Sequence, residues 1–337
     1  MVTASVAGNT LDRFANGRNR GGDYILKHMG PDGTIEDSRD RVWRYWGVPI
    51  ALAVSGHSAA AGRFLDWIRA NVFTPEGDFG TSPEKKQMAS YAYQNSWLIE
   101  GAHRLGQFDL SQRGMDFITP FWDPETGGFY SSYDERGDDT EMEIYITSGC
   151  GRAAVYTNRL DVARGVARFL RTVLDEQPNY PQQLYSVYTR GSGLLTHPDP
   201  SDKMEYVMSQ DSTVDQQFFN PGIAGGFLAR LYQATGEAEW LELAKRYMHF
   251  AEIASDHLIT LPGLRQGKTG WCASVLYTLT GEEKYRHLAT RIGDSILSHQ
   301  AQEGYWYGQS ADKEPSLNLT AEMVIWLDEI NQAFGHG

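Results

Sequence analysis

The sequence repeats a unit of two helices, and this repetition constrains the possible fold more than any other feature. Each unit has a first helix rich in small residues, a tight Gly or Asn turn, and a second helix whose charges lie on one face. Three segments show the pattern clearly, 147–170, 220–247 and 266–292, and two show it more loosely, 45–68 and 93–118. Repeats about 45–50 residues apart are typical of an array of helical pairs.

A sixth pair forms if the helix expected at 321–334 packs against the one expected at about 11–28. Glycines at equivalent points mark the turns of four pairs: Gly56, Gly106, Gly236 and Gly281. The first helix of each pair is apolar nearly all round, as a buried inner helix should be. We therefore expect an all-α (α/α)6 toroid of six inner and six outer helices, built as one domain over 1–337 with an inserted rim loop at about 177–213.

The composition limits the class of partner. The 337 residues carry 30 Lys and Arg against 43 Asp and Glu, a formal charge of −13, which argues against nucleic acid or an anionic membrane as the main partner. Two cysteines, Cys150 and Cys272, cannot build a disulfide framework. The N-terminus lacks the pattern of a secretion signal, and no apolar run approaches the ~18 residues of a membrane span. We expect a cytoplasmic protein without a membrane span.

All inner helices of such a toroid point the same way, so their N-terminal ends and the loops before them gather at one mouth. Alignment of the repeats puts five residues at one level of the inner ring: Trp43, Tyr93, Thr147, Ile223 and Lys268. The rim around them is rich in aromatic residues, namely Trp43, Tyr45, Trp46, Tyr91, Tyr93, Trp97, Tyr145, Phe218, Phe219 and Trp271. It also carries the acidic residues Asp138, Asp139, Glu141, Glu143, Asp211 and Asp215, and the basic residues Arg41, Arg44, Arg265 and Lys268.

Most of these features also have a plain structural explanation. The aromatic side chains can be core packing, and the acidic run at 138–143 can be a solvated loop at a helix N-terminus, where negative charge is favoured. Gly-aromatic hairpins at 75–80, 125–134 and 300–306 indicate a repeated architectural role. Histidines fall on outer helices or at the far ends of inner ones, which argues against a histidine proton shuttle or a zinc site at the mouth, unless the inserted loop delivers His197 there.

Lys268 is harder to explain structurally. It stands with Arg265 just before or within the start of an inner helix, where free N–H groups and the helix dipole already favour an anion. A cation at this end of a helix therefore calls for an anionic partner. The partner is either one of the rim carboxylates or a phosphate.

The helical-pair pattern, with PETGGFYSSYDERGD after an outer helix, resembles the broad (α/α)6 group around N-acylglucosamine 2-epimerases and unsaturated glucuronyl hydrolases. The resemblance to the epimerases implies paired histidines at the mouth, which this sequence does not supply. The resemblance to the hydrolases implies mouth aspartates that act as general acid and base, a role that Asp211 or Asp215 would fill.

The spacing Leu264-x-x-x-Lys268 resembles a narrower family, the atypical humulene synthases of fungal tropolone sesquiterpenoid pathways. That resemblance implies a helical-barrel sesquiterpene cyclase of secondary metabolism that binds farnesyl diphosphate through Mg²⁺ and an essential lysine. It also implies that the Leu four residues before the lysine shapes the product. The common cyclase motifs are missing, because GDDTEME lacks the last acid of DDxxD and neither the second metal-binding triad nor DxDD occurs.

On these grounds the sequence favours a Mg²⁺-dependent terpene cyclase acting on a prenyl diphosphate. Lys268, with Arg265 and Arg44, would bind the diphosphate and promote its ionisation. Mg²⁺ would be held by Asp138, Asp139, Glu141 and Glu143, with Asp211 and Asp215 as further catalytic carboxylates. The isoprenoid chain would be folded by Leu264, Trp43, Tyr93, Trp97, Phe219 and Trp271. A sugar hydrolase, lyase or epimerase and a binding protein without catalysis remain as alternatives, and the oligomeric state stays open.

Overall fold

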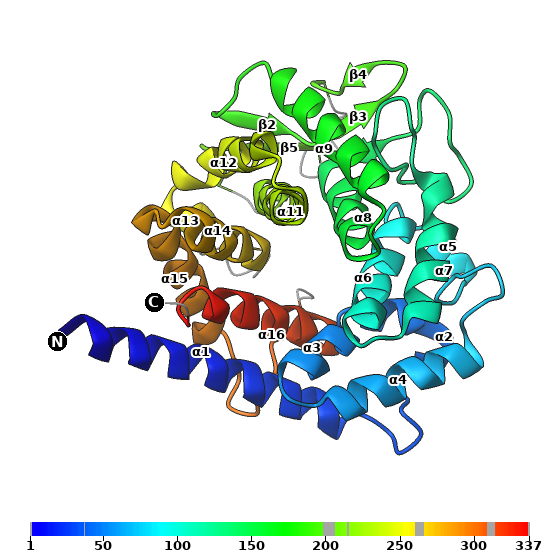
Figure 1. The fold of residues 1–337 in the computed structure, drawn as a ribbon, viewed down its shortest axis with the longest axis vertical. Helices are drawn as coiled ribbons and strands as arrows, with labels where there is room; N and C mark the ends of the chain where they lie inside the picture. Colours follow the sequence, from blue (N-terminus) through cyan, green and yellow to red (C-terminus); the bar gives the residue numbers. More distant parts are fainter. Residues whose placement is uncertain are drawn as a thin grey trace.

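The computed structural model describes residues 2–36, 38–197, 206–213, 216–259, 266–308 and 314–335. Helices dominate it, arranged as an inner ring wrapped by outer helices (Figure 1). The inner helices are α3 (Val48–Val54), α6 (Tyr91–Arg104), α8 (Ile144–Tyr156), α11 (Asn220–Thr235), α14 (Gly267–Thr280) and α16 (Leu317–Gln332). The outer helices are α1 (Val2–Lys27), α4 (Ser58–Asn71), α7 (Phe108–Ile118), α9 (Leu160–Asp175), α12 (Ala238–Glu252) and α15 (Glu283–Ser298).

The ring closes through the two end helices. Each inner helix packs against the outer helix that follows it, except α16, whose outer partner is α1 at the start of the chain. Helix α16 also contacts α14 on one side and α3 on the other, so the six inner helices form an unbroken circle. The expected (α/α)6 toroid, including the sixth pair made by the two ends, is confirmed.

Small residues let neighbouring inner helices approach closely. A Cβ atom added to Gly222 near the start of α11 would lie closer than 3.0 Å to the backbone of Thr269 on α14, nearer than real Cβ atoms come. The turns between paired helices use the left-handed conformation that the sequence predicts, at Gly56, Gly106, Gly236 and Gly281 and also at Asn158.

Gly-centred hairpins tie the mouth end of the ring to the outer helices. Glycines with positive φ at 33, 77, 127 and 304 each lie so close to a backbone carbonyl of an outer helix that a Cβ would collide with it. Three of the hairpins also bond to an inner helix: the Phe79 N–H donates to Asn95 Oδ1 at 3.2 Å, Phe129 to Thr147 Oγ1 at 3.0 Å and Trp306 to Thr320 Oγ1 at 3.1 Å. These contacts give the Gly-aromatic hairpins the architectural role expected from the sequence, because they join the inner helices to the outer ones.

The remaining elements are short. Helical turns occur at α2 (Ser38–Arg41), η1 (Val42–Tyr45), α5 (Pro83–Lys86), η2 (Thr119–Phe121) and α13 (Asp256–Ile259). The strands are β1 (Met142–Glu143), β2 (Gln183–Tyr185), β3 (Val187–Thr189), β4 (Gly193–Leu194) and β5 (Val207–Ser209), paired antiparallel in the orders β1-β3-β4 and β2-β5. Within the described ranges no helix is both long and apolar enough to cross a bilayer.

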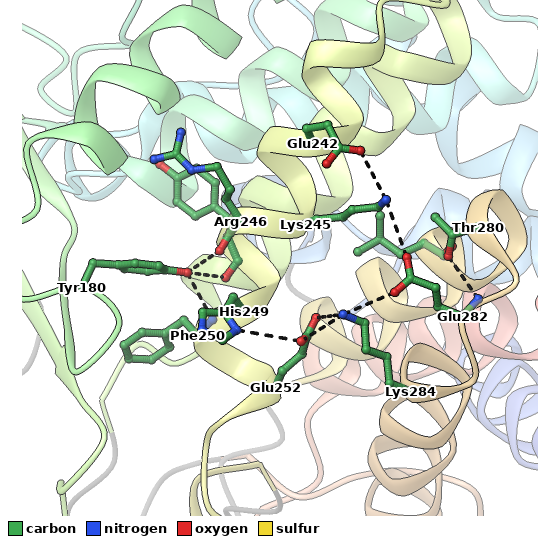
Figure 2. Close-up of polar contacts among 12 residues, drawn as sticks. Tyr180, Glu242, Lys245, Arg246, His249, Phe250, Glu252, Thr280, Glu282 and Lys284 are labelled. Atoms are coloured by element: carbon green, nitrogen blue, oxygen red, sulfur yellow. Dashed lines mark hydrogen bonds and ion pairs between the residues drawn. The ribbon is translucent and has the colours of Figure 1, made fainter.

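The rim insertion at 177–213 therefore carries strands where the sequence predicts only a loop. It is also anchored to the ring, because the Tyr180 hydroxyl donates to the carbonyl of Arg246 and accepts from the Phe250 N–H at 3.2 Å (Figure 2). The Gln210 side-chain amide adds a bond to the Phe250 carbonyl at 2.8 Å. These contacts fix the insertion on the end of α12, beside the mouth.

Candidate functional site

Aromatic side chains from four inner helices, α6, α8, α14 and α16, meet with two that lie just before α3 and α11. The aromatic cluster, as we call it, consists of Trp46, Tyr93, Trp97, Tyr145, Phe219, Trp271 and Trp326. Successive ring centroids lie between 4.6 Å (Trp46 to Trp97) and 6.2 Å (Tyr93 to Trp97), mostly in tilted or edge-to-face arrangements. Apart from Tyr145, its members are buried, so most of each ring is held in one orientation by packing.

Glycines on the neighbouring helix seat three of these rings. A Cβ on Gly149 of α8 would collide with the Tyr93 ring, one on Gly226 of α11 with the Trp271 ring, and one on Gly267 of α14 with the Trp326 ring. The small residues in the first helix of each repeat therefore do two things. They let the helices approach, and they make room for the aromatic cluster.

A buried ion pair lies against this cluster. The Lys268 ammonium, in the first turn of α14, bonds Glu322 Oε2 of α16 at 2.8 Å, and the two side chains are 7% and 14% exposed. The ammonium also lies 5.0 Å from the ring centre of Phe219 and 5.5 Å from that of Trp326. Burial works against the charged form, but Glu322 and Tyr93 outweigh it, so the pKa of Lys268 is raised above its ordinary value.

A second set of charged side chains lies farther along the inner helices, toward their C-terminal ends. The Arg152 guanidinium lies 3.9 Å from the ring centre of Trp97, and its Nε approaches Glu100 Oε2 to 2.6 Å. Arg104 reaches both Glu100 at 3.4 Å and Glu329 at 3.7 Å. These residues come from the C-terminal halves of inner helices, and each cation faces a carboxylate, so the charges of this layer are matched.

The basic and aromatic candidates from the sequence are only partly brought together. Tyr93, Trp97, Phe219, Trp271 and Lys268 meet in and against the aromatic cluster. Trp43 is buried, but its ring contact is with the guanidinium of Arg44, at 5.5 Å. Arg44 itself is exposed and pairs with Glu84 at 3.6 Å, away from Lys268. Leu264 and Arg265 lie outside the described residues.

Most of the acidic candidates at 138–143 lie at the surface, and Glu143 is buried. Asp138 is exposed and pairs with Arg190 of the insertion at 2.6 Å, and Glu141 accepts a bond from the Tyr206 hydroxyl. Asp139 and Glu141 line an open pocket of about 340 Å³ with Lys86. Glu143 is buried at the end of β1, where it precedes the first residue of α8.

Asp211 is likewise on the surface. It accepts a bond from Ser209 at the end of β5 and lines an open pocket of about 400 Å³ with Tyr180 and Gln182. Asp215 lies outside the described residues. In the part of the chain that the structure describes, no three His, Cys, Asp or Glu side chains are placed to hold a metal ion together. The Mg²⁺ expectation and the catalytic role of Asp211 stay predictions from the sequence.

Two members of the site were missed by the sequence reasoning, Glu322 and Trp326. Both are on α16, which the sequence identifies correctly as the helix that closes the ring. A signal was present, because Glu322 is the one charged residue between 315 and 327, the largely apolar first part of this inner helix. A lone carboxylate on a buried face needs a partner, and Lys268 needed one too.

The comparisons with known proteins identify the fold. Neither the family models nor the curated protein sequences give a match. Among solved structures, the α-1,6-mannanase GH76A from Salegentibacter sp. HEL1_6 matches with a TM-score of 0.67 at 11% identity, over 95% of this chain and 99% of that one. A D-mannose isomerase matches with a TM-score of 0.67 at 14% identity over 97% of each chain, and a heparin-specific unsaturated glucuronyl hydrolase with 0.65 at 12% identity over 96% and 97%.

The reading as a terpene cyclase related to the humulene synthases is therefore corrected. The similar structures are enzymes that act on carbohydrates, which supports the alternative rather than the prenyl diphosphate reading. The structure also supplies the physical reason why the sequence argument failed. The anionic partner demanded by Lys268 is the carboxylate of Glu322, so no diphosphate is needed to explain a cation at the start of α14.

Proposed function

We propose that this protein is a carbohydrate-active enzyme that binds a sugar against the aromatic cluster. The observation that carries the proposal is the Lys268–Glu322 ion pair set against the tilted and edge-to-face rings of the aromatic cluster. A sugar ring presents apolar C–H faces and polar hydroxyl edges. Aromatic faces suit the first, and a carboxylate beside an ammonium suits the second.

The chemistry of the similar structures points in the same direction. A mannanase, a mannose isomerase and a glucuronyl hydrolase share this fold, although at 11–14% identity the likeness itself concerns the fold alone.

Sugar binding and turnover test the proposal together. Tryptophan fluorescence is titrated with mannose, α-1,6-mannotriose, cellobiose and an unsaturated uronide, and products are separated by chromatography. At least one sugar is expected to change the fluorescence and to be converted. Tyr145→Ala, at the mouth, is expected to weaken binding at least tenfold, because it removes a ring that contacts Tyr93 and Phe219.

Tyr232→Ala is the matched control, since Tyr232 is also a half-buried inner-helix tyrosine but lies near the C-terminal end of α11. It is expected to bind as the wild type does. Absence of any binding or conversion across the panel refutes the proposal. Binding without conversion supports a sugar-binding protein in place of an enzyme.

A further inference from the structure

Only one of the two carboxylate oxygens of Glu322 is hydrogen-bonded to a described residue. Its Oε2 bonds the Lys268 ammonium at 2.8 Å, whereas Oε1 makes no hydrogen bond with any described residue. The Glu322 side chain is twice as exposed as that of Lys268, 14% against 7%. Of the two side chains, the carboxylate is therefore the more accessible to a ligand.

Other carboxylates near the ring axis are already engaged. Glu100 faces Arg152 at 2.6 Å and Arg104 at 3.4 Å, and its side chain is only 4% exposed. The one pair of consecutive aspartates, Asp138 and Asp139, is on the outer rim, with Asp138 held by Arg190. In the described part of the site, Glu322 is thus the carboxylate with an oxygen free to react.

The number of available carboxylates bears on the reaction class. Glycoside hydrolysis generally uses two carboxyl groups, about 5–5.5 Å apart in retaining enzymes and about 6.5–9.5 Å apart in inverting ones. Inversion at a carbon by proton transfer needs a base on one face and an acid on the other. Transfer of one proton between adjacent carbons on the same face needs a single base, together with groups that stabilise an oxyanion.

Two such groups belong to this site. Lys268 bonds Glu322 directly and lies 5.5 Å from the ring centre of Trp326, which packs on Trp97, and Trp97 in turn packs edge-on with the Tyr93 ring. Burial raises the pKa of Tyr93, so its hydroxyl keeps its proton and can donate it. The Lys268 ammonium likewise keeps its charge, and both groups are held against the rings of the aromatic cluster.

We infer that Glu322 is the catalytic base of an aldose–ketose isomerisation, with Lys268 as its positioning residue. The inference rests on the proposed function and names its reaction. The Glu322 carboxylate takes the proton from C2 of the open-chain aldose. The C–H electron pair forms the C1=C2 double bond, and the carbonyl π pair moves to O1, which takes the Tyr93 proton. Glu322 then returns its proton to C1 while the O2 hydroxyl gives up its proton to Tyr93, which leaves the 2-ketose.

Deuterium exchange tests this step directly. The full-length protein is incubated in D₂O with D-mannose, D-glucose and other aldohexoses, and NMR follows ketose formation and deuterium at C1 and C2. The wild type is expected to form ketose and to incorporate deuterium from solvent. Glu322→Gln, which keeps the shape and a hydrogen-bond acceptor for Lys268, is expected to lose about 10²–10⁴-fold in kcat with KM changed only a few-fold.

Two further variants keep the test decisive. Glu303→Gln, an exposed glutamate on the 300–306 hairpin, is the matched control and is expected to stay within twofold of the wild type. Should Glu322→Gln fail to fold by circular dichroism, Glu322→Asp withdraws the carboxylate by one methylene and is expected to retain the fold and lose at least tenfold in kcat.

The outcomes separate this inference from the proposed function. Sugar binding without ketose formation, or release of reducing ends from an oligosaccharide, overturns the isomerase inference and leaves the carbohydrate site in place. Full exchange by Glu322→Gln overturns the role of Glu322. If no sugar binds at all, the proposed function falls first, and the inference falls with it.

Discussion

Replacing Gly127 by Ala tests the idea that the hairpins are fixed to the outer helices by backbone contact. Gly127 has φ +87°, and a Cβ there would lie closer than 3.0 Å to the carbonyl of Gly165 on α9. The left-handed conformation costs an L-residue about 1–2 kcal/mol. Overpacking against a backbone atom that cannot rotate away adds about 1–3 kcal/mol. We expect Gly127→Ala to lower the free energy of unfolding by about 2–5 kcal/mol.

Two control substitutions separate these contributions. Gly236 also has positive φ, at +73°, but nothing lies within 4 Å of its added Cβ, so Gly236→Ala should cost only about 1–2 kcal/mol. Gly62 in α4 has open space and ordinary helical geometry, so Gly62→Ala should stabilise the protein by about 0.5–1 kcal/mol. Urea unfolding followed by circular dichroism gives the three values. If Gly127→Ala is no less stable than Gly236→Ala, the collision with α9 does not exist.

Three further predictions concern single side chains. Burial lowers the pKa of Lys85 from 10.5 to about 8, so between these pH values the folded protein binds fewer protons at Lys85 than the unfolded chain does. The free energy of unfolding, compared with that of Lys85→Met, should therefore rise by up to about 3 kcal/mol between pH 8 and 10.5. Urea midpoints at several pH values would measure this rise. An unchanged difference across that range contradicts it. Tyr180→Phe should cost about 1–2 kcal/mol and speed proteolysis of the 177–213 insertion, whereas Tyr185→Phe should not. Lys284→Gln removes ion pairs with Glu252 and Glu282 on the outer surface (Figure 2) and should cost under about 1 kcal/mol, a loss that 1 M NaCl abolishes.

The fold could be derived because its signals are local and repeated. Each pair has its own small-residue helix, turn and charged face, and the turn glycines fix the register of one repeat on the next. Closure then follows from counting, since five pairs and two unpaired end helices leave one way to complete the ring. Alignment of the repeats also placed Tyr93 and Lys268 at one level, and the structure brings both to the aromatic cluster.

The site could be derived only in part, because its decisive contacts join distant segments. The contact between Lys268 and Glu322 can be predicted only if the rotations of α14 and α16 about their own axes are known. Thr147 is predicted at the same level of the inner ring, but its hydroxyl accepts a hydrogen bond from the Phe129 N–H of a hairpin. The acidic loop at 138–143 turns outward because Asp138 pairs with Arg190 in the insertion. No local sequence pattern predicts this contact.

The pairing of α1 with α16 has a consequence for how the protein is made. During synthesis α1 emerges before every inner helix, and its main inner partner, α16, emerges after all the others. Helix α16 brings with it both Glu322 and Trp326, so a growing chain holds Lys268 near an aromatic surface without its counter-charge. The ring and the candidate site are therefore completed by the same event, and a nascent chain that stops before residue 317 has neither.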